Sequence, residues 1–324
     1  MKLTMIQADG MPVPAVLMEN GKLLNIARAQ SGGLLAEAGP IASLMKIIEI
    51  DGPAFSAVRG LADRVQSGDA SLTDRLASLG AFVDNQTATY SKLLQPNMIV
   101  SCGMGYKDHL REMKVTSLPK EPIAFLKAVG TQNWHGAPIV LPPQEPDMVD
   151  FECEFACVIG RSFHNVGPEE VLRHVAGYTM INDVGSRLSA KPFVDGLNGG
   201  CGSLAFMEIY VRSVLEKQFP GFCPIGPVIH TADTFGDPND VQVETRLNGE
   251  VMQSAHTSDL TFPIAFSLSY YSRWYRFQPG DVLTTGSPAG VGMGYDPPRY
   301  MKAGDVLETS GSRIGRMVNP LVAG

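Results

Sequence analysis

Two carboxylates separated by one residue stand in the most informative stretch of the chain, residues 150–160 (DFECEFACVIG). Side chains alternate between the two faces of a strand, so Glu152 and Glu154 would emerge side by side. Such neighbours on a strand that enters a core repel each other and are costly to desolvate. A bound divalent cation resolves both problems, and oxygen ligands favour Mg²⁺, Mn²⁺ or Ca²⁺ over zinc. A solvated edge strand that carries two acids is the alternative interpretation.

A third acid follows another apolar segment. Residues 178–182 (YTMIN) run directly into Asp183, and the ends of strands beside loops are places where sites tend to be built. Asp183 could instead cap a turn. Its presence favours a metal site over a solvated strand face.

A histidine and a glutamate three residues apart follow a stretch that contains two glycines. In residues 103–112 (GMGYKDHLRE), a helix that begins after the glycines would place His109 and Glu112 on one face. A carboxylate that holds an imidazole fixes its tautomer and raises its basicity, which makes a general base for water. On spacing alone, a surface helix with a His–Glu pair is the favoured interpretation.

The composition argues against several classes of protein. The chain of 324 residues carries a net charge of −7 at pH 7 and has no cluster of Lys and Arg, so we expect no nucleic-acid partner. No apolar run approaches the ~20 residues that span a bilayer, and the N-terminus lacks the apolar region of a signal peptide. We therefore expect no membrane partner and a cytoplasmic location. The five cysteines are scattered, form no CxxC pair and are interpreted as structural.

Residues 1–94 are predicted to form a small N-terminal accessory domain of the α+β class. Two strand-like stretches meet at residues 19–21 (ENG), since Asn-Gly favours a tight hairpin turn. Helical periodicity follows in residues 43–50 and 53–68. No constellation of polar residues that could do chemistry is found in this part.

Residues 95–324 are predicted to form a second, β-rich domain. Its short strands, separated by Gly, Pro, Asn and Asp, indicate a sandwich, roll or barrel. Residues 278–283 (QPGDVL) and 302–307 (KAGDVL) share a pattern of a turn followed by a strand. Helices are predicted at 168–178 and 262–275. The strand candidates are residues 98–106, 123–129, 137–141, 151–160, 177–185, 223–230, 241–252, 281–287 and 305–309.

An ordered series of segments over about residues 97–320 resembles the fumarylacetoacetate hydrolase family. The segments are GYKDHLRE, DFECEFACVIG, MINDVGSR, KQFPGFCPIGPVI, LNGEVMQSAHTSDL and QPGDVLTTGSPAGVG. Each segment alone is weak, but six in the family's order are highly specific. The resemblance implies an α+β, predominantly β fold with a mixed β-sandwich roll as the C-terminal catalytic domain. It also implies a homodimer.

The resemblance assigns a role to each candidate residue and implies one bound Mg²⁺, with Mn²⁺ or Ca²⁺ as alternatives. The implied residues are the metal ligands Glu152, Glu154 and Asp183, the catalytic residues His109, Glu112 and Lys217, and the substrate-binding residues Tyr106, Arg187 and Ser287. Simpler interpretations exist for three of them. Lys217 could be a solvated lysine at a helix end, Arg187 could pair with Asp183, and Ser287 could form a turn.

Four departures from the family's pattern concern the substrate pocket. Gly105 replaces a usual asparagine, Met104 stands where some acylpyruvate-cleaving members carry an arginine, and Ala190 replaces a common glutamine. The segment 191–216 is longer than is usual. These changes remove polar contacts and add a segment that could line the pocket. We therefore expect a substrate that is bulkier or less anionic than oxaloacetate or a simple acylpyruvate.

The leading hypothesis is a metal-dependent hydrolase that cleaves a carbon–carbon bond in a β-diketo or 2-oxo acid. The substrate would resemble an acylpyruvate or fumarylacetoacetate and would come from aromatic catabolism. A 2-oxo acid hydratase, isomerase or decarboxylase that uses the same site is the alternative. A non-catalytic binding protein is a third hypothesis, and the presence of the three acids with His109, Glu112 and Lys217 argues against it.

Overall fold

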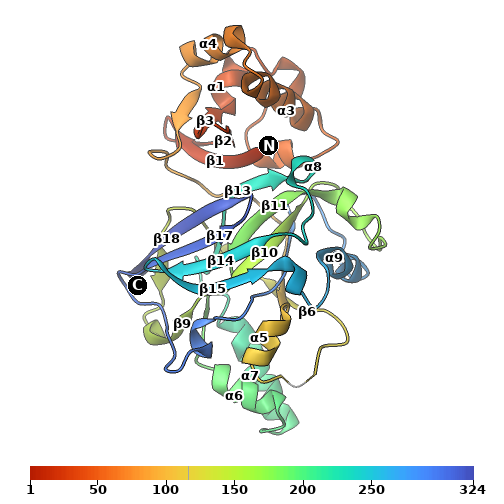
Figure 1. The fold of residues 1–324 in the computed structure, drawn as a ribbon, viewed down its shortest axis with the longest axis vertical. Coiled ribbons are helices and arrows are strands. Elements are labelled where there is room, and N and C mark those ends of the chain that lie inside the picture. The colour runs from red at the N-terminus through yellow and green to blue at the C-terminus, as the bar shows by residue number, and fades with distance from the viewer. Residues whose placement is uncertain (116) are drawn as a thin grey trace.

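The computed structural model describes residues 1–115 and 117–324. These residues form one large sheet of 11 strands, a second sheet of 5 strands and a pair of short strands. Figure 1 shows the sheets in the middle of an elongated molecule, with helical segments at both ends. The α+β class predicted from the sequence is confirmed. No helix within the described ranges is long and apolar enough to cross a membrane.

The N-terminal part contains a small antiparallel set of strands covered by helices. Strands β2 and β3 form the predicted hairpin, and in its turn the Gly21 amide donates to the Met18 carbonyl at 3.0 Å. The helices predicted at 43–50 and 53–68 are confirmed as α2 and α3. The elements are β1 (Lys2–Ala8), β2 (Met11–Leu17), β3 (Lys22–Asn25), α1 (Ile26–Ser31), η1 (Ala36–Ala38), α2 (Leu44–Ile48), α3 (Pro53–Gln66), α4 (Ala70–Ser78) and β4 (Phe82–Asp84).

The large sheet continues from this part into the rest of the chain. Strand β1 pairs with β13, so the strand order is β4-β3-β2-β1-β13-β11-β10-β16-β5-β6, with β7 beside β13. The additional strands are β5 (Ile99–Gly103), β6 (Ile123–Lys127), β7 (Gln132–Trp134), β10 (Cys153–Ile159), β11 (Val175–Asn182), β13 (Cys223–Thr231) and β16 (Val282–Thr284). One hydrophobic core joins Leu3 and Ile26 to Ala156 and Val158. The division of the chain at residue 94 stays a prediction.

The second sheet packs against β10, β11 and β13 of the large one. Its order is β15-β14-β17-β18-β8, and the core between the two sheets contains Phe155, Tyr178 and Val243. In the hairpin of β14 and β15, Asn248 and Gly249 both have positive φ (54° and 84°), as the tight hairpin turn requires. The strands are β8 (Ile139–Leu141), β14 (Gln242–Leu247), β15 (Glu250–His256), β17 (Val306–Gly311) and β18 (Gly315–Ala323), and the separate pair is β9 (Val149–Asp150) with β12 (Gly185–Ser186).

The two segments with a shared turn-then-strand pattern have the same local structure. In the first, the Asp281 carboxylate accepts a hydrogen bond from the Gln278 amide at 2.8 Å. In the second, Asp305 accepts from the Lys302 amide at 2.7 Å. The aspartate therefore closes each turn before β16 and β17 begin.

The helix predicted at 168–178 is wrong. A single 3₁₀ turn, η4 (Val171–His174), is followed at once by strand β11, which begins at Val175. Strand β11 pairs on both sides, with β10 and β13. These pairings outweigh the helical periodicity of the segment, since strand formation depends on neighbours that the local sequence does not contain.

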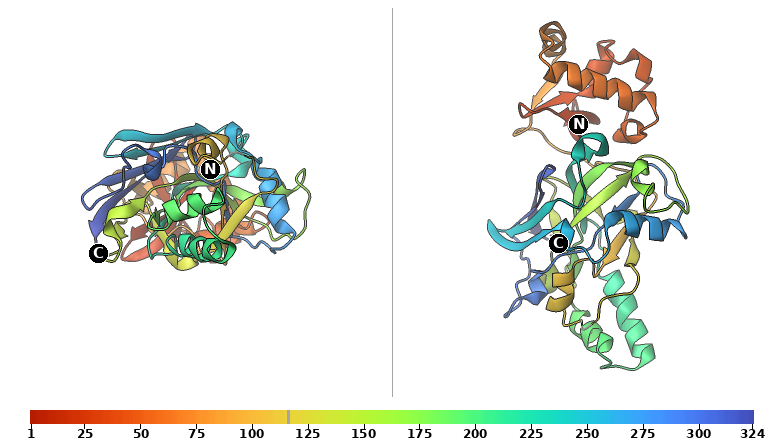
Figure 2. Two further views of the ribbon diagram at one scale, coloured as in Figure 1. Left: turned by 90° about the horizontal axis from the view of Figure 1, so that it is seen from below. Right: turned by 45° about the vertical axis from the view of Figure 1, so that its right-hand side comes forward.

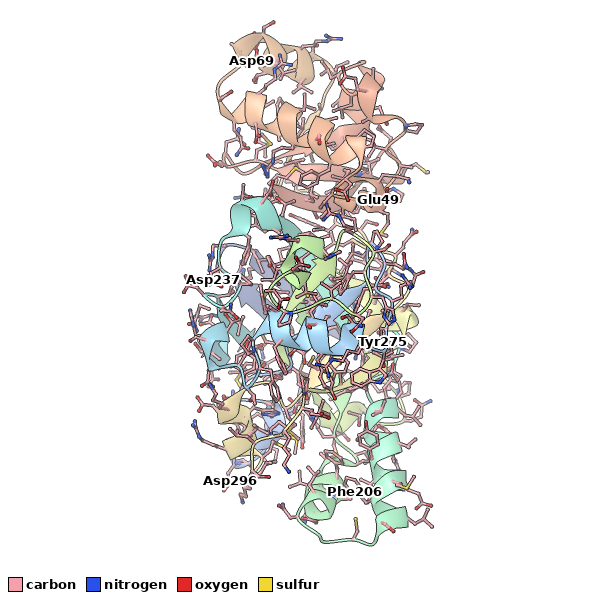
Figure 3. All side chains as sticks on the ribbon, turned by 90° about the vertical axis from the view of Figure 1, so that its right-hand side faces the viewer. Glu49, Asp69, Phe206, Asp237, Tyr275 and Asp296 are labelled. Atoms are coloured by element: carbon pink, nitrogen blue, oxygen red, sulfur yellow. The ribbon has the colours of Figure 1, made fainter. Side chains whose placement is uncertain are left out.

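The remaining helices surround the central sheets. The helix predicted at 262–275 is confirmed as α9. In the extra segment, α6 and α7 form a helical hairpin at the end of the molecule opposite the N-terminal part, as Figure 2 shows. Figure 3 labels Phe206 on α7 and Asp69 before α4 at these two ends. The elements are α5 (Lys107–Glu112), η2 (Val129–Thr131), η3 (Pro146–Met148), α6 (Ala190–Leu197), α7 (Ser203–Leu215), α8 (Ala232–Phe235), η5 (Thr257–Asp259), α9 (Ile264–Ser272) and η6 (Gly292–Gly294).

Candidate metal centre and active site

Strand β10 and the residue just before it carry two of the predicted acids. Cys153 and Phe155 lie in the core between the two sheets, so Glu154 faces the other way, and a carboxylate oxygen of Glu152 lies near it. Strand β11 runs beside β10 and ends at Asn182, and the Asp183 amide donates to the Glu152 carbonyl at 2.8 Å. One carboxylate oxygen from each of Glu152, Glu154 and Asp183 lies within 4.8 Å of the others.

The environment of Glu154 fits a bound cation. The side chain is completely buried, and neither carboxylate oxygen has a hydrogen-bond partner among the described residues. Burial, together with the nearby Asp183 and Glu152, raises the pKa of Glu154 well above its ordinary value. A buried carboxyl group without a donor is costly. A divalent cation with a preference for oxygen, such as Mg²⁺ or Mn²⁺, would supply the missing positive charge at this position.

The other two acids are already paired with a lysine. The Lys217 ammonium group lies 2.7 Å from Oε2 of Glu152 and 2.8 Å from Oδ2 of Asp183. Although burial opposes it, the attraction of Asp183 and Glu152 raises the pKa of Lys217. Against the effect of burial, Lys217 and Arg187 hold the pKa of Glu152 at about 2. Lys217 is therefore no solvated lysine at a helix end but a charged member of the cluster.

Arg187 pairs with carboxylates other than Asp183. Its Nε lies 2.8 Å from Oδ2 of Asp150, and its Nη2 donates to Oε1 of Glu152. Asp150 also accepts hydrogen bonds from the amides of Gly292 and Met293 at 2.7 and 3.1 Å, so it joins Arg187 to the loop that contains η6. Asp150 was not predicted as a site residue. The signal was present, because Asp150 is the preceding member of the two-residue alternation that contains Glu152.

A second buried lysine was also missed. Lys127, at the end of β6, has no exposed surface on its side chain, and its ammonium group donates to Oδ1 of Asp183 and to the Lys217 carbonyl. Two lysines therefore contact Asp183 from different sides. The only sequence signal was a charged residue at the end of the apolar run IAFLK.

We expect the substitution Lys127→Met to lower the free energy of unfolding by about 3 kcal/mol. It removes the buried lysine and leaves the buried carboxylate of Asp183 without one of its partners. Urea unfolding in EDTA would measure the change. Lys191→Met is the matched control: Lys191 pairs with Asp195 at 2.6 Å, but its side chain is 86% exposed, so no measurable change is expected. Equal effects of the two substitutions would contradict the structural role of Lys127.

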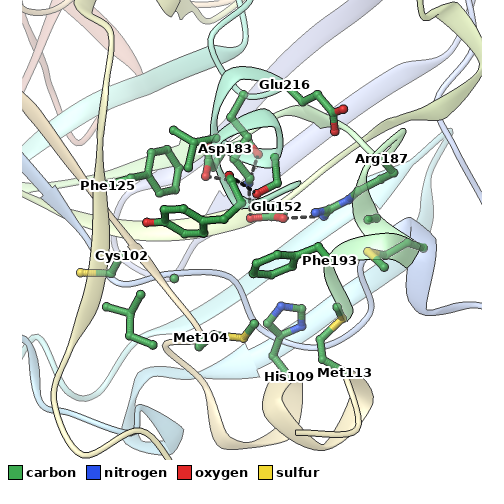
Figure 4. A pocket seen from close by; sticks show the side chains of 18 of the residues that line it. Cys102, Met104, His109, Met113, Phe125, Glu152, Asp183, Arg187, Phe193 and Glu216 are labelled. Carbon is green, nitrogen blue, oxygen red and sulfur yellow. Dashed lines mark hydrogen bonds and ion pairs between the residues drawn. The ribbon is translucent and has the colours of Figure 1, made fainter. Parts of the chain in front are cut away.

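The predicted histidine pair is formed on α5. Nδ1 of His109 lies 2.8 Å from Oε2 of Glu112. The other oxygen of this carboxylate, Oε1, accepts a hydrogen bond from the Gly290 amide at 2.8 Å. With Nδ1 held by the carboxylate, Nε2 is the ring nitrogen left to exchange a proton. The simple interpretation as a surface pair is excluded, because His109 is buried and lines a cavity that Glu152 and Asp183 also reach (Figure 4).

This cavity has a volume of about 150 Å³ and combines the charged cluster with an apolar wall. Met104 and Ala190, two of the departures from the family's pattern, line it, as do Phe193 of α6 and Tyr210 of α7. The extra segment is thus part of the pocket. The third departure, Gly105, lies where a Cβ atom would be 1.9 Å from the Thr285 carbonyl oxygen, so no larger residue fits this backbone.

Two of the predicted substrate contacts lie outside the cavity lining. Tyr106 is completely buried in the core between the sheets. Ser287 is also buried, and its hydroxyl group accepts a hydrogen bond from Nε2 of Gln253 at 2.8 Å. Their roles in substrate binding stay predictions.

Comparisons with known proteins show the family to which the chain belongs. The family described as fumarylacetoacetate (FAA) hydrolase C-terminal matches residues 98–322. A mitochondrial oxaloacetate tautomerase from Homo sapiens is 33% identical over 262 residues, which are 80% of this chain and 78% of that protein. A homologue of fumarylacetoacetate hydrolase domain-containing protein 2 from Dictyostelium discoideum is 35% identical, over 70% of this chain and 72% of its own length.

Solved structures share the whole fold. A fumarylacetoacetate hydrolase from Exiguobacterium antarcticum aligns over 100% of both chains with a TM-score of 0.72 and 30% identity. A maleylpyruvate hydrolase from Sphingobium in complex with manganese(II) and pyruvate also aligns over 100% of both chains, with a TM-score of 0.72. At 23% identity this second likeness shows the fold alone. The matched segments and the shared fold show that this chain belongs to the fumarylacetoacetate hydrolase family.

Proposed function

We propose that this protein is a divalent-metal-dependent enzyme that hydrolyses a carbon–carbon bond in a small β-diketo or 2-oxo acid. The observation that carries the proposal is the buried His109, which Glu112 holds at 2.8 Å and which lines the same cavity as Glu152 and Asp183. A base and a cation site on one cavity suit a reaction that moves a proton and develops negative charge on oxygen.

The metal site would consist of Glu152, Glu154 and Asp183, with Mg²⁺ as the proposed ion and Mn²⁺ or Ca²⁺ as alternatives. When bound, the cation would supply Lewis-acid stabilisation of negative charge on the substrate's oxygens. Lys217, which lies against two of the three carboxylates, would add a second positive charge for the same purpose.

His109 would act as the base on water. Nε2 takes a proton from water as its oxygen bonds to the carbonyl carbon remote from the substrate carboxylate. The bond from this carbon to the neighbouring methylene then breaks, and its electron pair remains on the 2-oxo acid fragment as an enolate. Return of the proton from His109 to carbon gives a 2-oxo acid, and the other product is a carboxylic acid. Glu112 keeps the imidazole in the required orientation throughout.

Tautomerisation or isomerisation of a 2-oxo acid is the second candidate function. It is favoured by relatives such as the oxaloacetate tautomerase of Homo sapiens. Both reactions need a positioned base and stabilisation of an enolate, so the same residues would serve either one. A hydratase or decarboxylase would use the same groups.

Product analysis separates these reactions. We expect acetylpyruvate with Mg²⁺ to yield acetate and pyruvate in equal amounts, measured by nuclear magnetic resonance. A tautomerase or isomerase would return all carbons in one molecule, and a decarboxylase would release CO₂. No turnover of any 2-oxo acid with Mg²⁺ or Mn²⁺ would overturn the proposal. Oxaloacetate as the best substrate would disprove the expectation of a bulkier or less anionic one.

Family membership also supports two further proposals, namely a homodimer and a place in aromatic catabolism. The cytoplasmic location stays a prediction, since the relatives include a mitochondrial protein. Light scattering of the purified protein would test the first of them. A monomeric mass at micromolar concentration would contradict it.

A further inference from the structure

A second cavity adjoins the site. It has a volume of about 430 Å³ and lies between the α6–α7 hairpin and a wall that includes Leu110, Val115 and Pro119. Met104, Ile123, Phe193 and Tyr210 line both cavities, so the two spaces meet at these side chains. We call this second space the apolar chamber.

The chamber differs sharply from the site in its chemistry. Its described lining contains no charged side chain, and its polar groups there are the side chains of Ser117 and Tyr210. The first cavity contains Glu152, Asp183 and Lys217. A molecule that occupied both spaces would therefore need an anionic or carbonyl-bearing end and an apolar end.

The α6–α7 hairpin supplies one wall of the chamber and keeps its side chains in place. Phe193 stacks on Phe206 with ring centroids 5.9 Å apart, and the centroid of the Tyr210 ring lies 6.3 Å from that of Phe193. Phe193, labelled in Figure 4 with His109 and Glu152, lines the first cavity as well as the chamber. The extra segment of the chain thus extends the site with apolar surface.

We propose that the chamber is a subsite for the apolar tail of the substrate, so that the preferred substrate is a 2-oxo acid with an alkyl or aryl group at the end remote from its carboxylate. The inference rests on the proposed function, because the site must first hold the 2-oxo acid head. Burial of each methylene group of the tail in the chamber then adds affinity by removing apolar surface from water.

Binding of unreactive acids tests the subsite separately from turnover. Calorimetry with saturating Mg²⁺ would measure the affinity for pyruvate, 2-oxobutanoate, 2-oxohexanoate and 2-oxooctanoate. We expect a gain of about threefold per methylene group, on the order of a hundredfold over the series. An affinity that is independent of chain length would overturn the subsite and leave the proposed function standing.

A pair of substitutions on the hairpin locates the effect. Leu197 lines the chamber and is 42% exposed, whereas Leu204 is 69% exposed and lines neither cavity. Leu197→Arg should reduce the affinity for 2-oxooctanoate by about tenfold or more and leave that for pyruvate nearly unchanged, because it fills the chamber with a charged side chain. Leu204→Arg should change neither affinity.

The outcomes separate the two proposals. Equal effects of Leu197→Arg and Leu204→Arg on 2-oxooctanoate would overturn the subsite. A gain with chain length, lost only in Leu197→Arg, together with no turnover of any acylpyruvate, would uphold the subsite and overturn the hydrolase. No binding of any of the four acids would overturn both.

Discussion

Replacing His109 with alanine is expected to lower kcat by about 10²–10⁴-fold, because the site loses the group that takes the proton from water. Nε2 of His109 is the ring nitrogen left free by the 2.8 Å contact between Nδ1 and Glu112. The substitution Glu112→Gln should give a smaller loss, since the imidazole remains but its orientation and basicity change. Steady-state kinetics with acetylpyruvate and saturating Mg²⁺ would measure both.

A second measurement shows whether the His109→Ala protein is still folded and still binds the metal ion. Stabilisation of His109→Ala by Mg²⁺ in thermal unfolding should equal that of the wild type, because the three carboxylates are untouched. His164→Ala is the control: His164 is exposed and contacts the Ser272 carbonyl, away from the cavity. Activity of His109→Ala within a few fold of the wild type would rule out its role as the base.

Two substitutions of neighbouring carboxylates are expected to have opposite effects on the stability of the metal-free protein. Glu152→Gln should lower the free energy of unfolding by about 3 kcal/mol, because it leaves buried Lys217 and Arg187 without one of their partners. Glu154→Gln should not lower it, because the buried carboxyl group that it removes has no hydrogen-bond partner among the described residues. Both variants should lose Mg²⁺ affinity and activity by on the order of a hundredfold or more.

The pH dependence should separate these two acids further. The pKa of Glu154 is raised by burial and by Asp183 and Glu152, so the folded protein keeps a proton that the unfolded chain releases above about pH 4.3. The stability of the metal-free wild type therefore falls as pH rises from about 4.3 towards the raised pKa of Glu154. Glu154→Gln removes this fall. The pKa of Glu152 is held at about 2, so the stabilisation of the folded protein by ionised Glu152 is present at neutral pH. This stabilisation is lost as pH falls towards 2.

Urea unfolding in EDTA at pH 5 and pH 8 would measure these effects. Glu154→Gln should be more stable than the wild type at pH 8, by a larger margin than at pH 5. Addition of Mg²⁺ should reverse the order, because the wild type alone keeps all three ligands. A Glu154→Gln protein that is less stable than the wild type at both pH values in EDTA would contradict the assignment of Glu154 as an uncompensated acid.

Much of the local structure could be predicted because its causes are local. The Asn-Gly turn at residues 19–21, the turns before β16 and β17, and helices α2, α3 and α9 depend on residues close together in the chain. The alternation of side chains in extended chain likewise places Glu154 of β10 and Glu152, the residue just before β10, on one side. The assignment at 168–178 failed because Val175 starts a central strand whose partners lie elsewhere in the sequence.

The acids Glu152, Glu154 and Asp183 could be identified as candidate site residues from their spacing and from the ordered segments around them. The same is true of His109 and Glu112. Only the tertiary structure decided how their charges are compensated. Lys127 comes from the end of β6, Lys217 lies two residues after the end of α7, and Arg187 contacts Asp150 rather than Asp183. No local pattern shows these partners, because ion pairs form between segments that only folding brings together. The same holds for the apolar chamber, whose walls are 70 or more residues apart in the sequence at Ile123 and Phe193.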